Sequence, residues 1–196
     1  MRAFEKAVVN SPFTAFLHRR LLLPTLARVA RDPVEGPLLE VGCGNGATTE
    51  GLLARWPRLA TTAIDIDPDQ VLRARLRLSG RARVEEGDVT RLAFPSGAFR
   101  TVVAMNVLHH VGEYERALHE VHRVLAPGGQ FLFTDYTSSF FRGPFGKWFP
   151  PEARFAKPAL RTALEGAGFQ VDVLSGTTTV VGRAVKERPG PRQAAD

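Results

Sequence analysis

The chain has 196 residues, of which 44% are hydrophobic and 23% charged, and its formal net charge at pH 7 is +6. This length and composition fit one α/β domain with a full core and exclude a largely disordered chain. No apolar run is long enough to cross a bilayer, no secretory signal pattern is present, and the single cysteine, Cys43, excludes an internal disulfide, so we expect a cytoplasmic protein.

Residues 2–31 carry apolar side chains at three- and four-residue steps, which predicts amphipathic helices. Ser11 and Pro12 are a typical helix start, as cap and first helical residue, and Pro24 is expected to kink or end the second helix. These helices either cover one edge of the core or form one wall of a substrate pocket. The sequence leaves both interpretations open.

The stretch Leu38 to Thr49, which reads LLEVGCGNGATT, is predicted to form a strand, a tight turn and the start of a helix. Gly42, Gly44 and Gly46 stand at alternate positions in it. Glycine is required where the backbone adopts a positive φ and where a ligand touches the main chain. We therefore expect a ligand to bind against this loop.

Beyond the loop, strand-like and helix-like segments alternate, which is typical of a parallel sheet with crossover helices. The last two strands are separated only by Ser175 and Gly176, so they must pair as an antiparallel hairpin. The predicted fold class is α/β, with a mostly parallel seven-stranded sheet, an antiparallel C-terminal hairpin and helices on both faces. After the first strand, the expected strands are 59–66, 81–86, 99–105, 130–134, 169–174 and 177–184, and the expected helices are 68–79 (capped by Asp67), 113–125 (stopped by Pro127-Gly128-Gly129) and 158–167.

Basic residues are spread along the whole chain, and their densest group brackets the predicted helix 68–79. We interpret this group as a solvated helix face, which argues against nucleic acid as a partner. Its members are Arg73, Arg75, Arg77, Arg81 and Arg83.

The glycine loop alone does not identify its ligand, because Gly42, Gly44 and Ala47 also satisfy the dinucleotide-binding pattern. Acidic residues at three predicted strand ends help to distinguish a dinucleotide from other ligands. Glu40 precedes the loop, and a carboxylate there suits a cationic ligand better than a pyrophosphate. With Asp65 placed for ribose hydroxyls and Asp88 for an exocyclic amine, the acids fit an adenosine that carries a positive centre, as S-adenosylmethionine does.

The same segments resemble the successive motifs of class I S-adenosylmethionine-dependent methyltransferases, in the order and approximate spacing of that family. The resemblance covers Leu38 to Tyr136. Within the family, the chain resembles the broad group of quinone-precursor, sterol and phospholipid methyltransferases. It implies a Rossmann-like sheet and S-adenosylmethionine as cofactor. The segments are LLEVGCGNGATT, TTAIDIDPDQVLRAR, EEGDVTRLAFPSGAF and NVLHHVGEYERALHEVHRVLAPGGQFLFTDY.

The resemblance also implies roles for individual residues. Methionine contacts fall on Glu40, Gly42, Gly44 and Asn106, the ribose contact on Asp65, and the adenine contacts on Ile66, Asp88 and Val89. Arg100 departs from the family, in which many relatives carry Asp directly after the aromatic residue at this point. This departure bears on local salt bridges more than on cofactor binding.

We interpret residues 1–186 as a single methyltransferase domain with N-terminal helices in 1–31, followed by a disordered tail at 187–196. Residues 137–158 form an aromatic insert, predicted to be a lid over an apolar or aromatic acceptor; packing into the core or a dimer interface is the alternative. Its aromatic side chains are Phe140, Phe141, Phe145, Trp148, Phe149 and Phe155, and Arg142, Lys147 and Arg154 could meet anionic head groups at a membrane surface.

Methyl transfer is an in-line displacement, so a dedicated base is optional. The candidate bases are His109, His110, Asp135 and Tyr136 near predicted strand ends. Cys43 is interpreted as a small buried filler, and no metal cluster is evident. The predicted function is methyl transfer to a quinone precursor, lipid or other small molecule; an RNA or protein methyltransferase and a non-catalytic binding protein are the alternatives.

Overall fold

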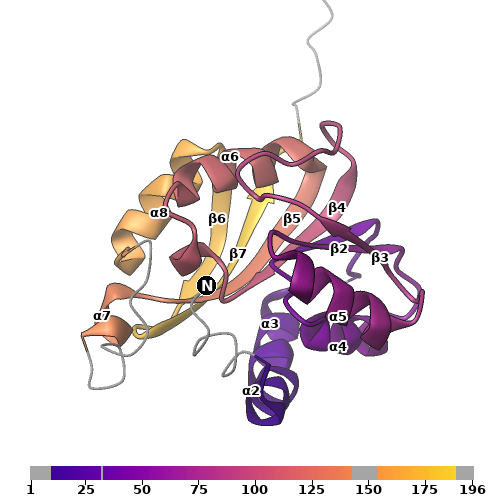
Figure 1. Cartoon of the computed structure of the whole chain (residues 1–196). Helices are drawn as coiled ribbons and strands as arrows, with labels where there is room; N and C mark the ends of the chain where they lie inside the picture. The colour runs from indigo at the N-terminus through magenta and orange to yellow at the C-terminus, as the bar shows by residue number, and fades with distance from the viewer. Residues whose placement is uncertain (1–9, 32, 143–153, 189–196) are drawn as a thin grey trace, which may run out of the picture.

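A computed structural model describes residues 10–31, 33–142 and 154–188. Its seven-stranded sheet has the order β3-β2-β1-β4-β5-β7-β6 (Figure 1), in which β1 to β5 are parallel, β7 pairs antiparallel with β5, and β6 pairs antiparallel with β7. This confirms the predicted sheet. The strands are β1 (Leu38–Val41), β2 (Thr61–Asp65), β3 (Arg83–Glu86), β4 (Phe99–Met105), β5 (Leu125–Tyr136), β6 (Phe169–Ser175) and β7 (Thr179–Lys186).

The strand order reverses between β1 and β4. From β1 the chain moves outward through β2 to β3, and then returns to place β4 on the other side of β1. In open α/β sheets ligands bind at such a switch point, beyond the carboxyl ends of the strands. The topology therefore directs attention to the segments that follow β1, β2, β4 and β5.

Helices cover both faces of the sheet (Figure 1). One side carries α2 (Pro12–Leu17), the π-helical η1 (His18–Leu22), α3 (Leu23–Val29), α4 (Ala47–Arg55) and α5 (Pro68–Leu78). The other side carries α6 (Tyr114–Val124) and α8 (Lys157–Gly166), and two short helices, η2 (Leu108–His110) and α7 (Ser138–Phe141), follow strand ends.

The core lies in layers because alternate residues of a strand face opposite sides. In β1, Leu38 packs with Leu26 of α3 and Leu52 of α4, whereas its neighbour Leu39 belongs to the larger cluster with Leu118 of α6. Because helices cover both faces of the sheet, every residue of β1 is buried. Glu40 is therefore carried into the interior by apolar neighbours.

The predicted helix starts are confirmed by their caps. Ser11 Oγ accepts the Thr14 backbone N–H at 3.1 Å before α2, and Asp67 Oδ1 accepts the Asp69 N–H at 3.0 Å before α5. Arg100 lies at the start of β4, where its Nε donates to Glu35 Oε2 at 2.8 Å.

Most predicted boundaries differ from the observed ones by one or two residues, and the largest difference is at the start of β5, which is predicted at residue 130. Helix α6 ends at Val124 and β5 begins at Leu125, so Pro127-Gly128-Gly129 lies within the irregular start of the strand instead of stopping the helix. The residue before a proline is restricted to extended conformations, which moves the helix end upstream of Ala126.

The aromatic insert is not wholly a lid. Phe141 is 6% exposed and Phe155 is 2% exposed, and Phe155 belongs to the larger core cluster. For these two side chains the predicted lid is wrong, because they pack where apolar surface is removed from water. Phe145, Lys147, Trp148 and Phe149 lie outside the described residues, as do 189–196 of the predicted tail. Across the described ranges, no helix has the length and apolar character needed to cross a membrane.

Candidate functional site

The glycine loop joins β1 to α4 at the switch point. Gly42, Gly44 and Gly46 have φ values of +68°, +53° and +80°, which confirms the predicted need for glycine. The loop is tied to the next strand by the Cys43 N–H, which donates to the Ile64 carbonyl at 2.9 Å. The Cys43 thiol is buried, and burial raises its pKa, so it is the predicted filler and no nucleophile.

Gly42→Ala is expected to destabilise the fold more than Gly80→Ala, although Gly80 also has a positive φ, of +78°. An added Cβ at Gly42 would lie 2.5 Å from Val107 Cγ2, whereas at Gly80 it would meet nothing within 4 Å. Backbone strain of about 1 kcal/mol is common to both variants, and the clash adds about 1–3 kcal/mol at Gly42. Urea denaturation measures the difference; equal losses would contradict the packing of this loop against Val107.

Glu40 is a buried carboxyl group without a partner. The residue is 0% exposed, and neither carboxyl oxygen has a hydrogen-bond partner among the described residues, nor has the nearby Thr49 hydroxyl. Burial raises the pKa of Glu40 to about 7, and Asp65 adds to the increase. The Thr49 hydroxyl lies close enough to favour the ionised form, but without the geometry of a hydrogen bond. An unpaired buried acid next to a ligand loop fits a cationic group such as the amine of S-adenosylmethionine.

Asp65 ends β2 and clamps the glycine loop. Its Oδ2 accepts the Gly44 N–H at 2.8 Å, and its Oδ1 accepts the Asp67 N–H at 3.0 Å. Burial raises the pKa of Asp65, against the opposing effect of these two bonds. Because an ionised carboxylate offers about four acceptor positions, Asp65 can hold the loop and still accept ribose hydroxyls.

The residues predicted to contact adenine lie at the ends of β2 and β3, which are adjacent strands. Ile66 is 67% exposed, which leaves an apolar side chain for a ring to cover. Asp88 accepts both the backbone N–H and the hydroxyl of Thr90 at 2.8 Å, so it also holds a turn. Val89, by contrast, is buried.

Asn106 follows β4 and adopts a left-handed conformation with φ of +58°. Its amide Nδ2 lies 3.3 Å from His18 Nε2, and His18 Nδ1 lies 3.3 Å from Thr48 Oγ1 at the start of α4. Burial lowers the pKa of His18, which keeps its ring neutral at pH 7. Sequence reasoning missed His18, since no local pattern links η1 to a residue 88 positions away.

A second cluster surrounds Asp135 near the end of β5. This fully buried carboxylate accepts the backbone N–H of Leu108 and of Tyr136, both at 2.7 Å, and lies 2.6 Å from His109 Nδ1. A carboxylate only accepts, so Nδ1 carries the hydrogen and Nε2 holds the lone pair. Asp135, one of the candidate bases, is therefore a buried partner of His109.

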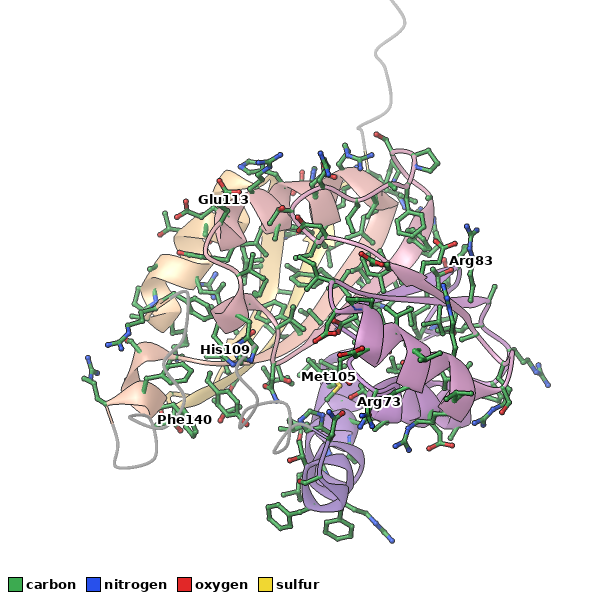
Figure 2. All side chains as sticks on the ribbon, viewed as in Figure 1. Arg73, Arg83, Met105, His109, Glu113 and Phe140 are labelled. Atoms are coloured by element: carbon green, nitrogen blue, oxygen red, sulfur yellow. The ribbon has the colours of Figure 1, made fainter. Side chains whose placement is uncertain are left out.

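Aromatic rings continue this cluster (Figure 2). The His109 ring lies 3.9 Å from that of His110, and the Tyr136 ring stacks on Phe140 at 4.3 Å. Burial, and then the Asp135 charge, raise the pKa of Tyr136, which keeps it a phenol. The ends of β4 and β5 thus present an aromatic wall beside the loop and the acids of β1 and β2.

Comparisons with known proteins agree with this arrangement. A family model described as a methyltransferase domain matches residues 39–133. The fatty-acid O-methyltransferase of Mycolicibacterium smegmatis is 41% identical over 110 residues, which are 54% of this chain and 39% of that protein. The demethylmenaquinone methyltransferase of Thermus thermophilus is 28% identical over 181 residues, covering 78% and 82% of the two chains.

Among solved structures, a methyltransferase in complex with the Haloferax volcanii Trm112 methyltransferase activator superposes with a TM-score of 0.78. Identity is 18% over 96% of this chain and 97% of that one, so the likeness shows a shared fold. This chain spans about two fifths of the length of the fatty-acid enzyme that it matches. The family model matches a little under half of the chain, and together with the fold and these relatives it makes the chain similar to methyltransferases that use S-adenosylmethionine.

Proposed function

We propose that this protein transfers the methyl group of S-adenosylmethionine to a small acceptor with an apolar or aromatic body. The unpaired carboxyl group of Glu40, buried beside the glycine loop, carries the proposal because it fits the cationic cofactor. The aromatic wall of His109, Tyr136 and Phe140 supports the acceptor class. Bound S-adenosylmethionine supplies a methyl group on a positively charged sulfur, and the chain aligns the acceptor with it.

The residues proposed to hold the cofactor come from four strand ends. Glu40 would accept from the methionine amine, and backbone N–H groups of the loop would face the methionine part. Asp65 would accept the ribose hydroxyls while it keeps the Gly44 bond. The full proposed set is Glu40, Gly42, Gly44, Asp65, Ile66, Asp88, Val89 and Asn106.

His109 is the proposed base for acceptors that need one. Asp135 fixes the ring with Nδ1 as donor, which leaves Nε2 to take a proton from an acceptor hydroxyl or acidic carbon. The acceptor atom then forms its bond to the methyl carbon as the carbon–sulfur bond breaks and its electron pair stays on sulfur. Tyr136 is a weaker candidate, because burial and the Asp135 charge raise the pKa of its phenol, and His110, whose ring lies 3.9 Å from that of His109, is the other candidate.

His109→Gln is expected to lower kcat by about 100-fold or more for a phenolic acceptor, with little change in KM, because general base catalysis contributes about this much. His119→Gln, on the exposed face of α6, is the matched control and should leave kcat unchanged. The measurement is the pH dependence of kcat. A variant whose kcat and pH profile equal those of the unmodified protein would remove His109 from catalysis.

A methyl-transfer screen tests the acceptor class. Radiolabelled S-adenosylmethionine would be offered with quinone precursors, fatty acids, phospholipids, small phenols and amines, since relatives are named for fatty-acid and demethylmenaquinone substrates. Calorimetry with S-adenosylmethionine, S-adenosylhomocysteine and NAD accompanies it. Cofactor binding without turnover of any acceptor would favour a non-catalytic protein or an RNA or protein substrate, and failure to bind either sulfur compound would overturn the proposal.

A further inference from the structure

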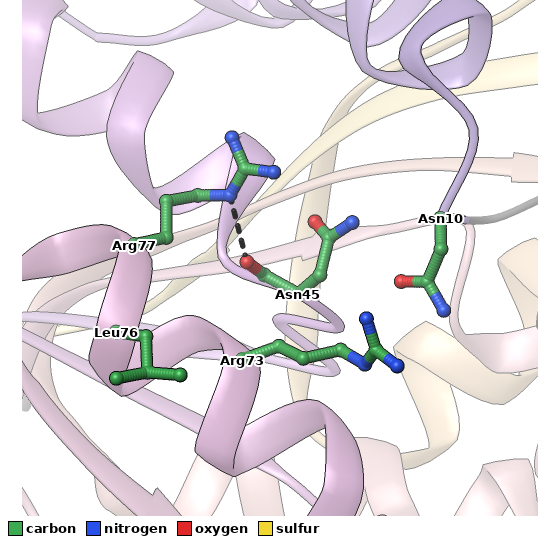
Figure 3. A pocket seen from close by; sticks show the side chains of 5 residues that line it. All are labelled: Asn10, Asn45, Arg73, Leu76 and Arg77. Carbon is green, nitrogen blue, oxygen red and sulfur yellow. Dashed lines mark hydrogen bonds between the residues drawn. The ribbon is translucent and has the colours of Figure 1, made fainter.

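A hollow in the protein surface is lined by residues other than those proposed to bind the cofactor (Figure 3). It has a volume of about 410 Å³ and lies between the outer face of α5, the turn of the glycine loop and the residue that leads into α2. Among the residues that the structure describes, two guanidinium groups and no carboxylate line it. The lining residues are Asn10, Asn45, Arg73, Leu76 and Arg77.

The two arginines are held differently. Arg77 Nε donates to the Asn45 carbonyl at 3.0 Å, and its Nη1 lies 3.6 Å from Glu50 Oε2, so this side chain is fixed against the loop. Arg73 makes no hydrogen bond or ion pair with any residue in the described part of the chain, and it extends across the hollow toward Asn10 (Figure 3). An unpaired guanidinium beside a fixed one suits a phosphate group, which accepts several N–H bonds at once.

Asparagine side chains complete the lining. Asn45 Oδ1 accepts the Ala47 N–H at 3.1 Å, which fixes the amide and makes its Nδ2 available as a donor. Asn10 Oδ1 is buried and has no hydrogen-bond partner within the described ranges. The guanidinium charge and the oriented Asn45 amide donor suit a phosphate, whereas the unsatisfied Asn10 oxygen is an acceptor that a head-group hydroxyl could satisfy.

The surface around the hollow is apolar as well as basic. On α5, Leu72 and Leu76 are 58% and 73% exposed and share a face with Arg73 and Arg77, because residues four apart on a helix are neighbours. Phe13 and Phe16 are exposed on α2, which begins two residues after Asn10. Ile66 is also exposed, but it belongs to the proposed adenine contacts and not to this surface.

We propose that the hollow binds the phosphate of an anionic phospholipid head group, so that α5 and the start of α2 dock the protein on a membrane surface. Exposed leucines beside arginines are the pattern of an interfacial helix, which combines apolar burial with attraction to anionic lipid. This docking surface differs from the insert 137–158. It does not depend on the proposed methyl transfer.

Sedimentation with vesicles tests the docking surface. The full chain would be mixed with vesicles of phosphatidylcholine alone and of phosphatidylcholine with phosphatidylglycerol. We expect binding to the anionic vesicles, weakened about fivefold by Arg73→Ala and about 25-fold by Arg73→Ala with Arg77→Ala. Arg58→Ala removes the same charge from an exposed site before β2 and should change binding less than twofold.

Controls separate this result from folding and from the proposed function. Calorimetry with S-adenosylmethionine should give the same affinity for Arg73→Ala as for the unmodified chain, which shows an intact fold. Equal binding to neutral vesicles, an equal loss in Arg58→Ala, or binding of inorganic phosphate without any binding to anionic vesicles would each overturn the lipid site. RNA binding that depends on Arg73, with no vesicle binding, would reassign the hollow to nucleic acid and overturn it too.

Discussion

Replacing Glu40 by Gln is expected to weaken S-adenosylmethionine binding about 10- to 100-fold, because hydrogen bonds to charged groups contribute about 1.5–3 kcal/mol. In the free protein the Glu40 carboxyl is buried and unpaired, with a pKa raised to about 7. A cationic ligand selects its ionised form. The affinity of the unmodified protein should therefore rise with pH up to about 7, by at most about tenfold per pH unit, and that of Glu40→Gln should not.

The same variant is expected to be more stable above pH 7. The unfolded carboxyl titrates near 4.5 and the folded one near 7, so between these values the folded state binds the extra proton. The free energy of unfolding then falls as pH rises through this window, by at most about 3 kcal/mol, and a neutral glutamine avoids the loss. A variant that is more stable but binds S-adenosylmethionine less tightly indicates that the original residue serves ligand binding and not folding.

Urea denaturation at pH 5 and pH 8, together with calorimetry, measures both effects. Glu86→Gln changes an exposed acid at the end of β3 and is the matched control. If Glu40→Gln bound the cofactor as tightly as the unmodified protein across this range, the methionine-side role of Glu40 would be wrong.

Asp65→Ala is expected to abolish detectable S-adenosylmethionine binding and to loosen the glycine loop. The change removes the proposed ribose acceptor and also the bonds from the Gly44 and Asp67 N–H groups. The loss of these bonds should lower the free energy of unfolding by about 1–3 kcal/mol, partly offset because a buried charge disappears.

Hydrogen exchange at the Gly44 amide distinguishes the two roles of Asp65. In Asp65→Ala this amide should exchange faster, whereas in Asp67→Ala, which removes the α5 cap, the Gly44 bond remains and exchange there should be unchanged. Unaltered cofactor affinity in Asp65→Ala would show that the ribose assignment is wrong, even with a loosened loop.

Local patterns were enough to predict much of this protein. The position of β4, Phe99–Met105, follows from the apolar run at its end, Val102 to Met105, and the caps at Ser11 and Asp67 follow from side-chain chemistry within three residues. The positive φ at the loop glycines is likewise a local steric requirement. These features need no knowledge of which segments meet in space.

Features that depend on distant contacts were not predictable in this way. His18 reaches Asn106 across 88 positions, and Asp135 turns inward because Leu108 and His109, about 27 positions earlier, satisfy its oxygens. Phe155 is predicted to be part of a surface insert because the segment 137–158 is broken by several glycines and prolines, but it fills the core. The clamp from Asp65 to Gly44 depends on backbone directions within the loop, which composition does not specify.

The reversal of strand order between β1 and β4 separates the proposed cofactor residues from the aromatic wall along the carboxyl edge of the sheet. Except for Asn106, the proposed cofactor residues lie at or just after the ends of β1, β2 and β3, whereas the aromatic wall lies at or just after the ends of β4 and β5. Substitutions on the acceptor side can therefore accumulate without disturbing the carboxyl groups on the other side. An arrangement of this kind lets evolution, or an engineer, retarget the acceptor while the methyl donor stays the same.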